Sequence, residues 1–293
     1  MVNVGDVDLQ SEEWRKDLVG FALERFTLIE DLTIQSTSSW VNHFYQETRT
    51  ALAAGGTRTV KGLGRGSELP TAKVSWTLNS ARIQKYGLKD FILYEDAISD
   101  NIDVVGRTLQ RIAHGVVNSV EDEIFQIVSG AGAGTGINTF ATTSVGGDQW
   151  DAASGLHPVK DILHAMSLIA DDGYREIYTG AGFIWLNYYD YRSLLVFVYD
   201  KGAQGPKFGE QILADGRVQQ TFLGLKVRLS ESVTTDVCLI GVSKTCATWK
   251  ELESLKVRIE DKSPQHFEVL AWQFGITELT DPNALCLITD TKT

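Results

Sequence analysis

DNIDVVGRTLQRIAHGVVNSVEDEIFQIVSG, residues Asp100 to Gly130, is the stretch that decides the fold. Its apolar residues recur at steps of three and four, the spacing of one stripe along an α-helix: Val105, Leu109, Ile112, Val116, Val120, Ile124 and Ile127. Asp100 is a suitable N-cap, and Gly130 follows the last apolar position, where helices commonly end. At the rise of an α-helix, this segment would be about 43 Å long.

We therefore expect a spine helix over residues 100–130 that runs along one side of a broad structure rather than disappearing into a compact core. Four residues are expected on its polar face: Arg107, Arg111, Asn118 and Glu121.

Composition excludes several classes of protein. The chain has 293 residues, 43% of them hydrophobic and 22% charged, which is ordinary for a protein with a substantial core. The net charge of -11 argues against a basic surface that grips nucleic acid. Acidic residues near the N-terminus and the absence of an apolar segment there predict that no signal peptide is present. The longest apolar run, 194–199, is too short to span a bilayer.

The three cysteines, Cys238, Cys246 and Cys286, form no CxxC pair, and we expect them to be small buried thiols.

The N-terminal third has too little apolar content to form a core of its own. Residues 11–26 predict a short amphipathic helix whose apolar face needs a partner in the same subunit or in a neighbour. We interpret residues 1–50 as an arm laid over other structure. Residues 51–95 are expected to form an extended hairpin, because apolar Val74, Trp76 and Leu78 alternate with polar residues. The alternative is a surface loop without a role.

The second half of the chain changes from helices to strands. Residues 156–173 predict a helix with Val159, Ile162, Leu163, Met166 and Ile169 facing a core. A buried strand at 183–186 should lead into a helix from Tyr188. Later segments have the alternation or apolar runs of strands: 237–243, 255–261, 267–279 and 284–289. This order predicts an α+β fold rather than a wound parallel sheet.

No catalytic or cofactor-binding set emerges from the sequence. The Gly-rich stretch from Ala131 to Trp150 follows a helix instead of a strand, so it lacks the setting of a dinucleotide loop. P-loop, GxSxG and HExxH motifs are also lacking. His157, Asp161 and His164 lie within two helical turns, but we favour ordinary surface histidines over a metal site because no further ligand is indicated. We expect a protein that binds and is not an enzyme.

The order of these parts resembles the major capsid proteins of tailed phages, whose fold is named after phage Hong Kong 97. Five stretches of the chain carry the resemblance: KYGLKDFILYEDAISDN before the spine helix, VEDEIFQIVSGAG at its end, LHPVKDILHAMSLI, FIWLNYYDYRSLL, and GRVQQTFLGLKVRLSESV before the late strands. The resemblance covers essentially the whole chain. It implies an N-terminal arm (1–50), an extended hairpin loop (51–95), a peripheral domain (96–150 and 250–293) and an axial domain (151–249).

The resemblance further implies a function. The chain would self-assemble as hexamers and pentamers into an icosahedral shell that encloses double-stranded DNA. The shell would assemble in the host cytoplasm and form the capsid of the virion. Because the long N-terminal scaffolding segment of the family is absent, the resemblance implies either a separate scaffold or a processed or naturally short chain. A portal and possible decoration proteins would be further partners. No motif around Lys61 or Lys73 matches the covalent cross-link of one lineage. The alternative is an encapsulin-type compartment around protein cargo, and a third hypothesis is an enzyme with an unrecognised site.

The residues we expect at contacts between subunits lie on the hairpin and the spine helix. Arg58, Lys61 and Arg65 place three positive charges at the hairpin tip of an acidic protein. We hypothesise that they dock on the spine-end cluster Glu121, Asp122 and Glu123 of a neighbouring subunit, while Trp76 of the returning strand adds apolar contact. The alternative is a solvated basic loop.

Overall fold

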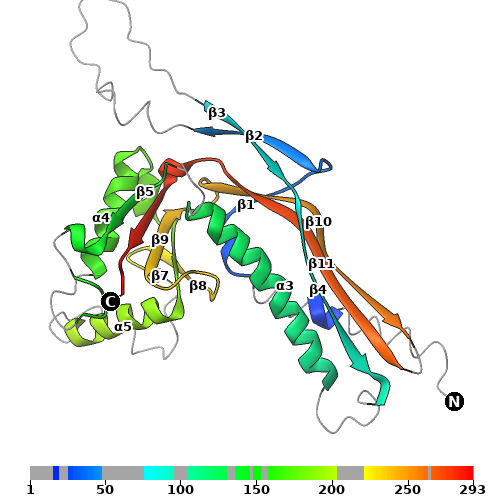
Figure 1. Cartoon of the computed structure of the whole chain (residues 1–293). Coiled ribbons are helices and arrows are strands. Elements are labelled where there is room, and N and C mark those ends of the chain that lie inside the picture. Colours follow the sequence, from blue (N-terminus) through cyan, green and yellow to red (C-terminus); the bar gives the residue numbers. More distant parts are fainter. Residues whose placement is uncertain are drawn as a thin grey trace, which may run out of the picture.

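The structure is a computed structural model that describes residues 16–19, 26–47, 76–95, 104–130, 136–145, 148–152, 158–202, 221–262 and 265–292. Its strands form a four-stranded sheet, a six-stranded sheet and a two-stranded ribbon (Figure 1). The strands of both sheets are largely antiparallel, and helices pack beside them. The predicted α+β class is therefore confirmed.

The four-stranded sheet has the order β1-β10-β11-β4. It consists of β1 (Thr33–Ser36), β10 (Ala247–Asp261), β11 (His266–Leu279) and β4 (Gln84–Leu93). β1 runs parallel to β10, and the other pairs are antiparallel. Gly275 of β11 allows one close packing contact, since a Cβ there would lie 2.1 Å from the ring of Trp249 on β10.

The spine helix is α3 (Val104–Val128), and it lies along β4 and β11 as the long ribbon in Figure 1. Five residues of the predicted stripe are 0–1% exposed: Leu109, Ile112, Val116, Val120 and Ile124. Burying each such side chain contributes about 1.5–3 kcal/mol, so the stripe alone accounts for firm attachment of the helix. Gly130 has a φ of 73° and follows the helix end, as predicted. The predicted cap Asp100 lies outside the described residues.

One residue of the spine helix was predicted wrongly. Glu121 was expected on the polar face, but it is only 3% exposed. The reason is that the N-terminal segment crosses α3 at this position, with the 3-10 turn η1 (Leu28–Asp31) packed against the helix. Gly115 shows a similarly close approach on the sheet side, because a Cβ there would lie 2.9 Å from the Leu88 side chain.

The six-stranded sheet has the order β5-β12-β9-β6-β8-β7. Its strands are β5 (Asn138–Ala141), β6 (Gly182–Leu186), β7 (Thr221–Phe222), β8 (Leu225–Leu229), β9 (Val237–Val242) and β12 (Leu285–Thr289). All five residues of β6 are buried between antiparallel β9 and parallel β8. Around the sheet lie α4 (Pro158–Asp171), α5 (Tyr188–Gly202) and the 3-10 turns η2 (Thr142–Val145), η3 (Arg175–Thr179) and η4 (Pro282–Ala284).

The core face of α4 is largely as predicted. Ile162, Met166 and Ile169 are buried, and the helix packs on β12 and β9. Leu163 is a wrong prediction because it is 44% exposed. The buried flank of the helix is instead occupied by Asp161, whose Oδ2 accepts a hydrogen bond of 3.0 Å from Trp150 Nε1.

The N-terminal segment packs on its own subunit. Residues 16–19 are helical, and Leu18 and Phe26 belong to the core cluster. For these two side chains, the partner of the apolar face is therefore the same subunit. Cys238, Cys246 and Cys286 are buried free thiols, as predicted.

The extended hairpin starts earlier than predicted. β3 (Trp76–Arg82) pairs with β2 (Val41–Glu47), so the outgoing strand lies within residues that we assigned to the arm. Local alternation shows that a strand is present but does not identify its partner across a long connection. The ribbon leaves the four-stranded sheet and projects away from it (Figure 1).

Strand grouping also differs from the expected division. β5 and β12 were placed with the spine helix, but both lie in the six-stranded sheet, where β12 pairs with β5 and β9. The chain therefore returns to the six-stranded sheet at its C-terminal end.

Candidate functional site

The β2–β3 ribbon carries an exposed apolar face. Tyr45 pairs with Leu78 in the antiparallel register, and alternation places Val41 and Trp76 on the same side. The exposed fractions of these side chains are 45% for Val41, 63% for Tyr45, 57% for Trp76 and 57% for Leu78. Tyr45, Trp76 and Leu78 are neighbours on this face, whereas His43 and Ser80 lie between them and Val41. A two-stranded ribbon is marginally stable in water, and exposed apolar surface commonly marks an interaction site. This face is a candidate contact between subunits.

The base of the ribbon is fixed to the subunit. The Trp40 ring meets Phe274 of β11 edge-on, with ring centroids 5.5 Å apart. Ile83 N donates to Trp40 O at 3.0 Å, and Ile83 itself is buried. The direction of the ribbon relative to the four-stranded sheet is therefore set inside the subunit before any partner binds.

The outer face of the four-stranded sheet is a ladder of charges and aromatic rings. Lys85 Nζ lies 5.9 Å from the Trp272 ring centroid and 5.6 Å from that of Phe274. Trp272 Nε1 donates to Glu253 Oε2 at 3.0 Å. The hydrogen bond from Lys256, together with that from Trp272, lowers the pKa of Glu253. Three ion pairs neutralise part of the charge on this face: Glu253 with Lys256, Glu268 with Lys89, and Glu260 with Arg258.

The predicted acidic cluster is divided by the structure. Glu121 is buried and hydrogen-bonded within the subunit, Asp122 is exposed, and Glu123 is half-buried. Burial raises the pKa of Glu123. Burial also raises the pKa of Tyr86 on β4, and the charge of Glu123 adds to that shift. Asp122 is thus the member that remains open to a partner, and its contact with another subunit stays a prediction. The tip residues Arg58, Lys61 and Arg65 lie outside the described residues.

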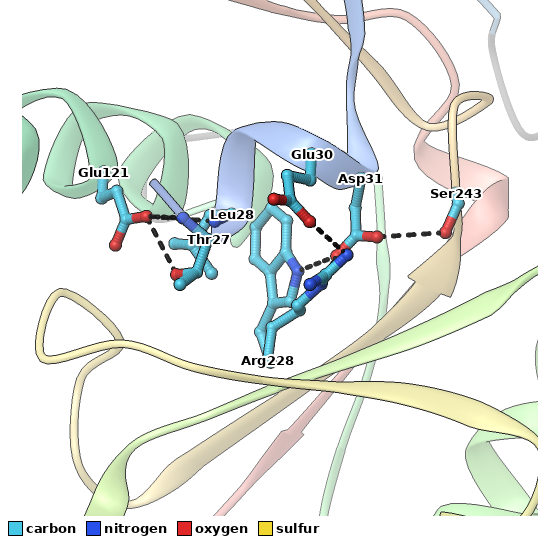
Figure 2. Close-up of polar contacts among 8 residues, drawn as sticks. Thr27, Leu28, Glu30, Asp31, Glu121, Arg228 and Ser243 are labelled. Atoms are coloured by element: carbon cyan, nitrogen blue, oxygen red, sulfur yellow. Dashed lines mark hydrogen bonds and ion pairs between the residues drawn. The ribbon is translucent and has the colours of Figure 1, made fainter. Parts of the chain in front are cut away.

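A polar cluster around the buried carboxylates of Glu121 and Asp31 joins the spine helix to the six-stranded sheet, and we call it the η1 joint (Figure 2). On its helix side, Glu121 Oε1 accepts from the backbone N of Thr27 at 2.6 Å and of Leu28 at 3.1 Å. Glu121 Oε2 accepts from the hydroxyl of Ser230, which directly follows β8. One carboxylate therefore satisfies the first amides of η1 and also contacts the end of a strand.

The sheet side of the η1 joint is held by Asp31, which is 1% exposed. Its Oδ2 accepts from Trp185 Nε1 on β6 at 3.0 Å and from Arg228 Nε on β8 at 3.3 Å. Its Oδ1 accepts from Ser243 Oγ at 3.3 Å, just after β9. Glu30 Oε2 lies 2.7 Å from Arg228 Nη2. The four residues of η1 thus connect α3 with three strands of the sheet.

Sequence reasoning missed the η1 joint. Asp31 is 154, 197 and 212 residues away from Trp185, Arg228 and Ser243. Nothing local distinguishes it from an exposed acid, although the adjacent Leu28 and Leu32 could have indicated a packed turn.

The described part of the chain holds no group of three or more potential metal-ligating side chains. His164 packs edge-on against Phe140 with ring centroids 4.9 Å apart, and His157 lies outside the described residues. Of the helices that the structure describes, none has the length and apolar content to cross a bilayer.

No protein-family model matches the chain, and neither does a curated protein sequence. Solved structures do. A virus-like particle from Pyrococcus furiosus aligns with a TM-score of 0.62 and 10% identity, over 95% of this chain and 99% of that one. The capsid of cyanophage P-SCSP1u aligns with a TM-score of 0.61 and 12% identity, over 90% of this chain and 88% of that one. The capsid of a native GTA particle aligns with a TM-score of 0.61 and 14% identity, over 93% of this chain and 90% of that one. The chain therefore has the Hong Kong 97-like capsid fold, in agreement with the resemblance of its sequence.

Proposed function

We propose that this chain is a major capsid protein that self-assembles into an icosahedral shell around the double-stranded DNA of a tailed virus. The observation that carries the proposal is the alignment of nearly the whole chain with shell proteins, including 99% of the particle subunit from Pyrococcus furiosus. The exposed apolar face of the β2–β3 ribbon supports it, because a subunit that worked alone would leave this face in water.

In this shell, each ribbon packs its apolar face on a neighbouring copy. Four large apolar side chains supply the contact area, and many repeated modest contacts close a stable shell. The tip residues Arg58, Lys61 and Arg65 add charge pairs with the exposed Asp122 and the half-buried Glu123 of the neighbour. Such rim pairs contribute about 0.2–1 kcal/mol each and mainly set orientation and encounter rate.

The two sheets take separate places in the proposed shell. The six-stranded sheet with α4 and α5 forms the axial domain at the centre of each hexamer or pentamer. The four-stranded sheet with α3 forms the peripheral domain. A scaffold, a portal and decoration proteins complete the particle, which assembles in the host cytoplasm. The net charge of -11 suits a container that does not adsorb densely packed DNA.

The alternative is an encapsulin-type compartment around protein cargo. The alignments support it equally, since the matched structures include a virus-like particle as well as a phage capsid.

Particles of the purified full-length protein separate these functions. Negative-stain images should show closed shells, and nuclease-protected double-stranded DNA should copurify when the protein is expressed with its viral partners. Shells that protect a specific protein and no DNA would support the compartment. A discrete small oligomer without shells, in the presence and absence of a scaffold, would contradict both.

A further inference from the structure

We propose that Asp31 is a proton-binding site, and that its proton controls how firmly the N-terminal segment holds the spine helix and the six-stranded sheet together. In the η1 joint, this residue ends the short turn that contacts the spine helix at one end and the sheet at the other. Glu121 of α3 holds the first residues of η1, and three strands hold its last residue (Figure 2). A change of charge at Asp31 therefore acts on both sides of the joint.

Two carboxylates share a single guanidinium at this position. Arg228 Nη2 lies 2.7 Å from Glu30 Oε2, whereas Arg228 Nε lies 3.3 Å from Asp31 Oδ2. Glu30 is 53% exposed, so solvent supports its charge, but Asp31 is 1% exposed. Burying a carboxylate is costly unless its charge is fully paired. A shared cation leaves part of the Asp31 charge uncompensated.

The other charged and titratable groups around Asp31 do not supply the missing positive charge. Lys226 on β8 is the weakest of the favourable electrostatic influences on it. Burial raises the pKa of the Cys246 thiol to about 12, so this group is neutral at physiological pH. The backbone N–H of Lys244 donates to the backbone O of Asp31 at 2.6 Å, and this neutral contact adds no positive charge. Glu121, at the other end of η1, adds a further carboxylate.

The proton has a defined place in the joint. Oδ2 of Asp31 faces two N–H donors, Trp185 Nε1 and Arg228 Nε, and an added hydrogen there would clash with them. Oδ1 faces the hydroxyl of Ser243, which can accept as well as donate. A proton taken from solvent onto Oδ1 is donated to Ser243 Oγ, whose own hydrogen rotates away. Both bonds to Oδ2 remain.

The sign of the pH effect follows from burial. Desolvation raises the pKa of Asp31, and the Trp185 hydrogen bond and Arg228 offset only part of the shift. In an opened joint Asp31 would be solvated, with its ordinary pKa. The closed joint therefore binds the proton more tightly, and it gains stability as pH falls through the raised pKa. Each unit of pKa difference changes the opening equilibrium by about tenfold.

Hydrogen exchange of the full-length protein over a pH series tests this inference. The readout is the protection of the Thr27, Leu28 and Lys244 amides, which are bonded inside the joint, after correction for the pH dependence of intrinsic exchange. Wild-type protection should rise on acidification, by about tenfold for each unit of pKa difference. Asp31→Asn should show at neutral pH the protection that wild type reaches in acid, without further pH dependence.

Glu30→Gln is the matched control variant. It leaves Arg228 to Asp31 alone, so the rise in protection should move to lower pH. Wild-type protection that is flat or falls on acidification would overturn the inference, as would an Asp31→Asn joint that opens more readily than wild type at every pH. If circular dichroism shows that Asp31→Asn does not fold, the wild-type and Glu30→Gln series still decide the sign.

Discussion

The η1 joint and the β2–β3 ribbon are separated only by β1 and a short turn, yet their surfaces are opposite in kind. In the joint, Asp31 and Glu121 are 1% and 3% exposed and accept hydrogen bonds from the same subunit. In the ribbon, four large apolar side chains are 45–63% exposed. The joint is complete within one subunit, whereas we propose that a partner subunit covers the ribbon. Substitutions on the two sides should therefore affect different measurements.

The largest effect on subunit stability is expected in the spine helix that supports the joint. Val116 is 1% exposed, so Val116→Asp buries an unpaired charge and should lower the free energy of unfolding by at least about 3 kcal/mol. Urea denaturation measures this loss. Arg111→Asp, at an exposed position of the same helix, is the control and should change stability by about 0.5 kcal/mol or less. Equal stability of both variants would show that the stripe is not a packing face.

The next effect is expected at Glu121. Glu121→Ala removes the acceptor for the amides of Thr27 and Leu28, and leaving buried donors unpaired should cost about 2–3 kcal/mol of unfolding free energy. The neighbouring Asp122 is exposed, so Asp122→Ala should be nearly neutral. Similar losses from both substitutions, measured by the same denaturation, would mean that the joint contributes nothing specific.

The ribbon should show the reverse behaviour. Trp76→Ser combined with Leu78→Ser removes two exposed apolar side chains, so subunit stability should change by about 0.5 kcal/mol or less. Assembly yield in sedimentation should fall sharply because the proposed contact surface is lost. Thr77→Ala, on the opposite face of the same strand, should assemble normally. Unchanged yield from the double variant would remove the ribbon from the assembly contacts.

The smallest effect is expected at the hairpin tip. Changing Arg58, Lys61 and Arg65 together to Glu should leave the subunit folded by circular dichroism and slow assembly, and raised ionic strength should slow wild-type assembly in the same direction. Asp122→Lys in this triple variant should restore part of the rate if the charges meet. Normal assembly of the triple variant would exclude the docking, and an unfolded subunit would assign the tip to folding.

The sequence predicted those features whose signal is local. The periodicity around Val116 identified the spine helix, and Gly130 identified its end, because one helix face and one turn are encoded within a few residues. The strand at 183–186 and the helix after it were predicted for the same reason. The order of such elements then carried the resemblance to the capsid fold.

The remaining features depend on contacts between distant residues. The partner of β3 is β2, and Glu121 meets Thr27 across 94 residues. A helix position with a Glu looks solvent-facing until another segment crosses it, and a lone Asp31 carries no sign of the tryptophan and arginine that surround it. Pairing across long connections has no local signature, so the joint and the start of the hairpin could not be predicted.

Self-assembly into a closed shell is tested most directly by light scattering of the purified full-length protein at increasing concentration, with and without a coexpressed scaffold. We expect particles far heavier than the 32.3 kDa subunit, with a narrow distribution of mass. A scattering mass that stays at that of a monomer under all these conditions would contradict it.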